Sequence, residues 1–199
     1  MLRATFDSQL TSVAPFIFYL VVAAIIFVET GIILAFFLPG DSILFSAGLV
    51  VSNQPKLNIW LLCAIVFIAA FVGDQTGFVI GKLVGRPYLE KRNSPAIKRM
   101  IVRAEKFYES SGFWAVVAAR YFPWIRSFIP PIAGAAKMNY YKFLFANALG
   151  ALVWAVLITM AGFYAATIPW VKQSSYGLAT FFIGASIISG LVNWKRRKQ

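Results

Sequence analysis

The chain has 199 residues, of which 60% are hydrophobic and only 13% are charged. Soluble domains average roughly 45–50% apolar and about 25% charged residues, so this composition excludes an ordinary soluble domain. With no histidine and one cysteine, the sequence also excludes an intrachain disulfide, histidine-based catalysis and His or Cys metal clusters. We therefore expect a membrane protein that is not an enzyme and that binds neither a metal nor another cofactor.

The net charge of +12 has a specific meaning in a membrane protein. Lys and Arg gather in loops that stay in the cytoplasm and beside anionic lipids. The sequence contains no base-reading motif, so nucleic acid is not an expected partner. The basic residues of 86–112 and 195–198 predict instead that both segments, and with them the C-terminus, are cytoplasmic.

Long apolar runs without period-two alternation predict helices and argue against a β-barrel. The first run should break at Pro39-Gly40, because proline lacks a backbone donor and glycine is conformationally free. After the break, Ile43–Val51 would extend only about 13 Å as helix, too short to cross the hydrocarbon. Residues 14–51 are therefore predicted to form a re-entrant hairpin, which enters and leaves the membrane on one side.

Residues 59–84 are predicted to form a full span. Its second half carries glycines at four-residue spacing, which permit close approach of a neighbouring helix: Gly73, Gly77, Gly81 and Gly85. Ser94 and Pro95 then mark a helix start, and residues 95–111 combine basic and apolar residues at helical spacing. This pattern predicts an amphipathic helix in the cytoplasmic interface, with an ordinary soluble loop helix as the alternative.

The order of hairpin and span then recurs. The prolines within 113–138 forbid one continuous helix and predict a second re-entrant hairpin. Residues 140–168 and 178–194 are predicted to be further spans. The whole chain, 1–199, is thus expected to be a single all-α membrane domain. The repeated hairpin and span predict an inverted repeat, as in secondary transporters whose broken helices meet near the midplane.

Charged residues interrupt the apolar runs at five positions: Glu29, Asp41, Asp74, Arg120 and Arg126. A charge at depth costs at least about 2.5–3.5 kcal/mol on insertion scales, so such residues pair or line a wet cavity. A guanidinium matches phosphate oxygens two at a time, which predicts a headgroup site at Arg120 and Arg126. A carboxylate in a low-dielectric cavity can take up protons near neutral pH, a role predicted for Glu29 and Asp41.

Static ion pairing between the two hairpins is the alternative interpretation of these charges. Asp74 is expected to support the site. It could instead pair along its own helix with Lys82, two turns on, or with Arg86.

Three sequence blocks follow one another over about residues 29–154. They are Glu29 with Pro39-Gly40-Asp41-Ser42-Ile43-Leu44 and Ala47-Gly48; Gly73-Asp74-Gln75-Thr76-Gly77 through Gly81 to Gly85-Arg86; and Arg120-Tyr121-Phe122-Pro123-Trp124-Ile125-Arg126 with Pro130, Ala133-Gly134, Met138, Phe143, Asn147, Gly150 and Trp154. In this order they resemble the DedA family, also called the VTT or SNARE-associated-Golgi-type membrane proteins.

The resemblance implies a multi-pass protein of the bacterial inner membrane with paired re-entrant loops. It implies movement of a lipid phosphate, either undecaprenyl phosphate or a phospholipid, between leaflets, coupled to protons, Na⁺ or the membrane potential. The functional acids of the family correspond to Glu29 and Asp41, and its functional arginines to Arg120 and Arg126. Asp41 stands where the family often has the longer Glu, a change that could alter coupling.

A second class of function uses the same residues. The acids could carry H⁺ or Na⁺ alone, with the arginines as counter-charges, in a proton or cation exchanger or pore acting in envelope homeostasis. A structural or assembly role is a third class. The sequence does not define the transported lipid, the direction of transport or the oligomeric state.

Overall fold

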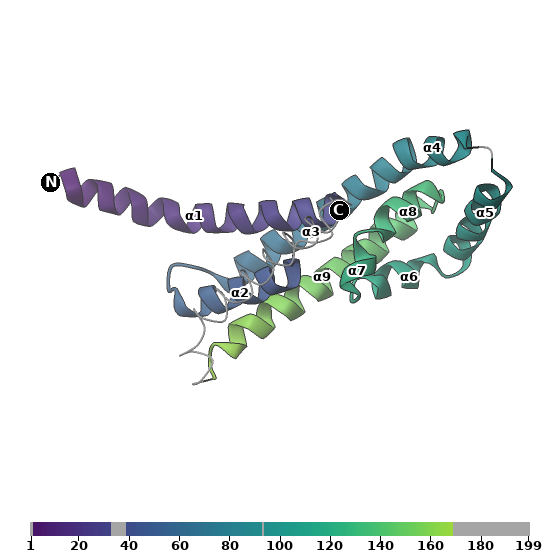
Figure 1. Ribbon diagram of the computed structural model, residues 1–199. Helices are drawn as coiled ribbons and strands as arrows, with labels where there is room; N and C mark the ends of the chain where they lie inside the picture. Colours follow the sequence, from purple (N-terminus) through teal and green to yellow (C-terminus); the bar gives the residue numbers. More distant parts are fainter. Residues whose placement is uncertain (1, 33–38, 93, 169–199) are drawn as a thin grey trace, which may run out of the picture. The chain divides into compact units, whose positions relative to one another are not determined.

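The computed structural model describes residues 2–32, 39–92 and 94–168 (Figure 1). Its helices are α1 (Leu2–Gly31), α2 (Gly40–Asn53), α3 (Ile59–Ile80), the π-helix η2 (Gly81–Gly85), α4 (Arg86–Lys91), α5 (Pro95–Ser110), α6 (Gly112–Ala119), α7 (Pro123–Arg126), α8 (Ile129–Ala135) and α9 (Tyr140–Ala165). The described residues contain no strand, which confirms the predicted all-α class. The predicted span 178–194 and the basic C-terminus lie outside the described residues.

Three helical stretches are long and apolar enough to cross a membrane. They are Ala14–Gly31, Ile59–Lys91 and Tyr140–Ala165. The last of them matches the predicted span 140–168. At 14 residues, α2 is about 21 Å long, so it falls short of the roughly 30 Å hydrocarbon core as predicted.

The first helix differs from its predicted boundaries at both ends. α1 begins at Leu2 rather than near 14, and it includes Pro15. It ends at Gly31, eight positions before the predicted break at Pro39. Glycine is the poorest helix former after proline, so a helix can end there without waiting for the proline. Pro39 still precedes the next helix directly, because α2 begins at Gly40.

The second span also runs further than predicted. The helix continues from Ile59 to Lys91 without a break, whereas residue 84 was the predicted end. Gly81–Gly85 forms a π-helical turn, closed by a hydrogen bond from the Arg86 N–H to the Gly81 carbonyl. This wider turn lies directly before Pro87, whose ring would crowd the preceding turn of an α-helix. The chain therefore passes the proline without ending the helix.

The proline-rich region 113–138 is broken as predicted. α6 ends at Ala119, and the short helices α7 and α8 begin with prolines in their first turns, where the missing N–H costs nothing. The predicted amphipathic helix over 95–111 is confirmed as a helix by α5. Its buried positions are Ile101 and Tyr108, seven residues apart and therefore on one face.

The chain divides into two compact units, each described here by itself. Among the described residues, the first unit contains 2–26, 39–66 and 155–168, and the second contains 27–32, 67–92 and 94–154. In the first unit, α2 packs closely against the C-terminal half of α9. The position that a Gly48 side chain would occupy lies within 3.2 Å of the Gly162 carbonyl carbon, so this contact requires glycine on both helices.

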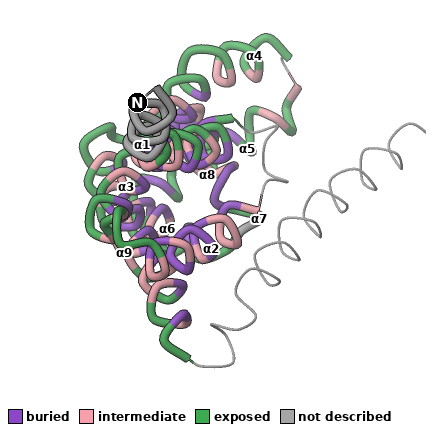
Figure 2. Tube along the Cα trace, turned by 90° about the vertical axis from the view of Figure 1, so that its left-hand side faces the viewer, coloured by how far each residue is buried: buried purple, intermediate pink, exposed green. Residues whose placement is uncertain are grey.

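The second unit is built around α8, which lies against η2. A side chain at Gly81 would collide with the Pro131 carbonyl, and one at Gly134 would collide with the Phe78 carbonyl. The predicted close approach at the glycine face of α3 is therefore confirmed. Most residues of α8 are buried, whereas α4 has no buried residue (Figure 2). Phe78 also stacks on Phe143 of α9, with 4.5 Å between the ring centroids.

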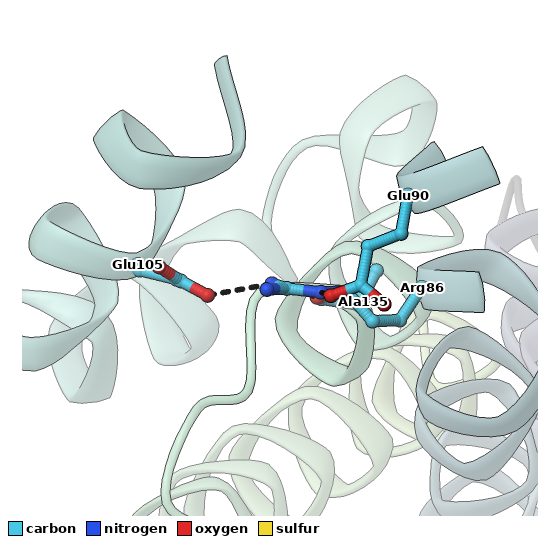
Figure 3. A network of polar contacts seen from close by, with 4 residues as sticks. All are labelled: Arg86, Glu90, Glu105 and Ala135. Carbon is cyan, nitrogen blue, oxygen red and sulfur yellow. Dashed lines mark hydrogen bonds and ion pairs between the residues drawn. The ribbon is translucent and has the colours of Figure 1, made fainter. Parts of the chain in front are cut away.

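Arg86 ties three helices of this unit together, as Figure 3 shows. Its Nε lies 2.6 Å from Glu90 on α4, and its Nη1 lies 2.6 Å from Glu105 on α5. The same Nη1 donates to the carbonyl oxygen of Ala135 at the end of α8, at 3.1 Å. One guanidinium thus holds α5 and α8 at the end of the long α3–α4 helix.

Two glycines on the same helix should respond differently to alanine. We expect Gly81→Ala to lower the yield of folded protein severely, because its Cβ would overlap the Pro131 carbonyl. Gly85→Ala is the matched control: its Cβ would make ordinary contact with the Ala135 Cβ at 3.7 Å. Size-exclusion profiles of both variants in mild detergent measure the effect. A normal profile for Gly81→Ala would contradict the close packing of α8 on η2.

Candidate functional site

Two arginines lie in the broken region between α6 and α8, and both are buried. Arg120 caps the C-terminus of α6, and Arg126 closes α7 with a backbone bond from its N–H to the Phe122 carbonyl at 3.1 Å. Only 6% of Arg120 and 7% of Arg126 is exposed, which is rare for arginine unless it is paired. The helices end and restart at this proline-rich segment, and both guanidinium groups are buried within the second unit.

Arg120 pairs with Asp74 of α3. Its Nη1 donates to the Asp74 Oδ2 and also to the Asn147 Oδ1 at 2.9 Å. Asn147, on α9, is held in place by donating its Nδ2 to the Phe71 carbonyl at 3.2 Å. A guanidinium therefore bridges α3 and α9 inside the unit, with an amide fixing its position.

Arg126 pairs with Glu29, near the end of α1. The Arg126 Nη2 lies 2.5 Å from the Glu29 Oε1, and only 2% of Glu29 is exposed. Both arginines also share one aromatic ring. The Trp154 centroid lies 5.2 Å from the Arg120 guanidinium carbon and 4.8 Å from that of Arg126, distances at which a cation–π attraction is expected.

We call this set the buried charge network: Glu29, Asp74, Arg120, Arg126, Asn147 and Trp154. It contains two positive and two negative side chains, so it is neutral when all four are ionised. Pairing makes such burial tolerable, because an isolated buried charge would cost far more.

The network still holds donors that are not used by the described part of the chain. The Arg120 Nε and Nη2 are buried and have no hydrogen-bond partner there. The same holds for both polar atoms of Gln75, the neighbour of Asp74 on α3. A buried donor without a partner costs about 1–3 kcal/mol. These atoms are therefore suited to bind water or a polar ligand.

The structure places the predicted site residues in two groups. Glu29, Asp74, Arg120 and Arg126 come together as two ion pairs, Asp74 with Arg120 and Glu29 with Arg126. Asp41 lies in the first unit, in the first turn of α2, so its predicted coupling role stays a prediction.

The suggested pairing of Asp74 with Lys82 or Arg86 is wrong. Asp74 bonds to Arg120, while the Arg86 guanidinium is engaged by Glu90 and Glu105. Spacing along one helix favoured those partners. In the structure the Asp74 side chain is buried and pairs with Arg120 at the end of α6. Three members of the site received no role from the sequence: Gln75, Asn147 and Trp154. Polar or amphipathic residues inside apolar runs were the signal available for all three.

The VTT domain matches residues 38–164. The chain is 37% identical to Protein DedA of Escherichia coli (strain K12) over 183 residues, covering 91% of this chain and 84% of that protein. The chain belongs to the DedA family. An uncharacterized membrane protein of Mycobacterium leprae is 34% identical, covering 84% of this chain and 75% of its own length.

A third DedA relative is the inner membrane protein YghB of Salmonella typhimurium, 29% identical over 87% of this chain and 81% of that protein. No solved structure matches the chain. Bacterial membrane relatives and three apolar helices together make this DedA-family chain a multi-pass bacterial membrane protein.

Proposed function

We propose that this protein moves a lipid phosphate, undecaprenyl phosphate or a phospholipid, between membrane leaflets. The observation that carries the proposal is the pair of buried guanidinium groups that both lie within 5.2 Å of the Trp154 ring centroid. Arg120 and Arg126 bind the phosphate, because a planar fork of donors matches two phosphate oxygens and keeps its charge when buried. The unused Nε and Nη2 of Arg120 support this role.

Phosphate binding requires the arginines to exchange partners. Each guanidinium is held by a carboxylate, Arg120 by Asp74 and Arg126 by Glu29. When phosphate takes their place, a carboxylate left in the low-dielectric site is stabilised by binding a proton. We propose Glu29 and Asp41 as the proton-coupling residues, with Asp74 in a supporting role.

The proposed path uses the two segments in which the helices are broken. The breaks before α2 and within 113–138 fit two re-entrant hairpins in an inverted repeat, the arrangement of transporters whose site lies near the midplane. The headgroup then crosses beside the buried charge network while the lipid chains stay in the bilayer. The protein acts as a transporter and not as an enzyme.

The test uses proteoliposomes that contain the purified protein and a fluorescent lipid phosphate in both leaflets. A membrane-impermeant quencher reports which headgroups face outward, with and without a pH gradient. We expect the protein to accelerate exchange between leaflets and the gradient to bias it. Proton flux in liposomes without any lipid phosphate would favour the exchanger or pore, and release of free phosphate would favour an enzyme.

The proposed topology places α5 and the C-terminus in the cytoplasm and the protein in the inner membrane. α5 supports this, since Arg99, Arg103, Phe107 and Met100 are all exposed, which suits a helix lying on anionic lipid. In protein whose Cys63 is replaced by Ala, we expect Lys98→Cys and Gln199→Cys to resist an impermeant maleimide in intact spheroplasts. Both should react in inverted vesicles. Labelling of either position from outside would refute this topology.

A further inference from the structure

The second unit contains a cavity apart from the buried charge network. It has a volume of about 210 Å³ and lies between the C-terminal half of α5 and the connection from α8 to α9. Glu105, Tyr108 and Glu109 form one wall, and Lys137, Asn139 and Lys142 belong to the opposite wall. A water molecule takes up about 30 Å³ in the liquid, so the cavity suits a group several times larger than water.

The two walls carry opposite charges. Glu105 already faces the Arg86 guanidinium at 2.6 Å (Figure 3), which leaves Glu109 as the carboxylate available to a ligand. Within the described chain, Glu109 forms no ion pair. The Lys142 ammonium lies 3.5 Å from the backbone carbonyl of Glu109, so it reaches across to the last turn of α5. The cavity is thus lined by the Glu109 carboxylate and by two lysines, of which Lys137 also interacts with the exposed Glu90.

The backbone at Lys137 adds an independent observation. Lys137 has a φ of 53°, the one positive φ outside glycine among the described residues. It occupies the position after a helix end that normally takes glycine, since Met138 N–H bonds to the Ala133 carbonyl and Lys137 N–H to that of Gly134. A lysine at this strained position is explained by its side chain, because the backbone alone would favour glycine.

The cavity lies at the start of an apolar span. α9 begins at Tyr140, and both Tyr140 and Tyr141 are exposed, as is Phe145 one turn further on. Tyrosines of this kind mark the headgroup level of a bilayer. A lipid whose headgroup enters the cavity can therefore lay its chains along the exposed apolar face of α9.

We propose that this cavity binds the headgroup of a phospholipid that carries both a phosphate and a primary ammonium. Lys137 and Lys142 bind the phosphate, and Glu109 accepts hydrogen bonds from the ammonium. A phosphocholine headgroup has no N–H to donate, and a phosphoglycerol headgroup offers only neutral hydroxyl donors. Both should therefore lose the charge-assisted hydrogen bond to Glu109. Free glycerophosphoethanolamine shares the chemistry but lacks the chains that follow α9.

The test measures thermal unfolding of the full-length protein in detergent during titration with dihexanoyl lipids. The phosphoethanolamine lipid should bind about tenfold more tightly than its phosphocholine and phosphoglycerol counterparts, the worth of one charge-assisted hydrogen bond. Glu109→Gln should remove this preference. Free glycerophosphoethanolamine should bind at least about tenfold more weakly than the lipid; equal binding would overturn the assignment to a lipid.

Lys137→Gly separates binding from folding. Relief of the left-handed strain should raise the melting temperature without lipid by about 2–4 °C, while affinity for the lipid falls about tenfold. Lys98→Gln removes an exposed charge of α5 that does not line the cavity and should bind as the natural chain does. Unchanged affinity in Lys137→Gly and Glu109→Gln would overturn the proposal.

The proposed transport site can be tested apart from this one. Arg126→Lys alters the buried charge network but no residue of the cavity, so it should keep the roughly tenfold preference for the phosphoethanolamine lipid over its phosphocholine counterpart. Loss of that preference in Arg126→Lys would assign the headgroup recognition to the buried network and overturn the cavity as its site.

Discussion

Replacing Arg126 with lysine should leave the protein folded and inserted but reduce lipid transport by about ten- to a hundredfold. Lysine keeps the positive charge and can still pair with Glu29, whose carboxylate lies 2.5 Å from the Arg126 Nη2. It loses the planar fork, and so cannot hold a carboxylate or two phosphate oxygens with parallel donors. One charge-assisted hydrogen bond is worth roughly 1.5–3 kcal/mol, which corresponds to about that loss in headgroup affinity.

The measurement is lipid exchange per folded protein in proteoliposomes, beside expression and melting temperature. Arg103→Lys is the matched control, because Arg103 lies exposed on α5 and makes no contact with the buried charge network. If Arg126 served only as a static partner of Glu29, Arg126→Ala would lower folded yield and Arg126→Lys would restore yield and transport together. Normal transport by Arg126→Lys would therefore count against phosphate binding at this residue.

Much of the fold was predictable because hydropathy and proline act locally. Apolar runs of sufficient length gave the spans, and the prolines after Phe122 gave the break that becomes α7 and α8. The ends of helices were less predictable where the conformational preference of the local residues did not determine them. α1 stops at Gly31 although its apolar run continues, and the helix of α3 passes Pro87 by way of the η2 turn.

The charged members of the site were predictable, but not all of their partners. A charge in an apolar run signals function from sequence alone, and this pointed to Glu29, Arg120 and Arg126. The partners come from distant parts of the chain: Asp74 and Arg120 are 46 positions apart, and Glu29 and Arg126 are 97 apart. Which acid meets which arginine depends on how the helices pack, and no local pattern encodes that choice.

Removing either partner of the Asp74–Arg120 pair should destabilise the protein far more than removing both. The pair is buried, with 5% of the Asp74 side chain and 6% of the Arg120 side chain exposed. An uncompensated charge in such a place costs about 3–5 kcal/mol, whereas a well-packed apolar pair in its place is often neutral. Asp74→Leu and Arg120→Leu should therefore each lower folded yield strongly. The double variant should recover most of it.

The recovery should be incomplete, because Asn147 loses the donor that Arg120 supplies to its Oδ1 at 2.9 Å. An orphaned buried acceptor costs about 1–3 kcal/mol. Glu90→Gln is the control: the Glu90 side chain is 52% exposed, and Arg86 keeps Glu105 and the Ala135 carbonyl, so folded yield should stay unchanged.

Transport by the double variant distinguishes the two roles of the pair. If the charges only hold α3 against α6, the double variant should regain transport along with stability, since an apolar contact can perform that task. If Arg120 binds phosphate, the recovered protein should remain inactive, because leucine offers no donor to an anion. The double variant would then regain stability in thermal unfolding without regaining lipid exchange in proteoliposomes. A stable and active double variant would show that the Asp74–Arg120 pair is structural and would leave Arg126 as the phosphate-binding arginine.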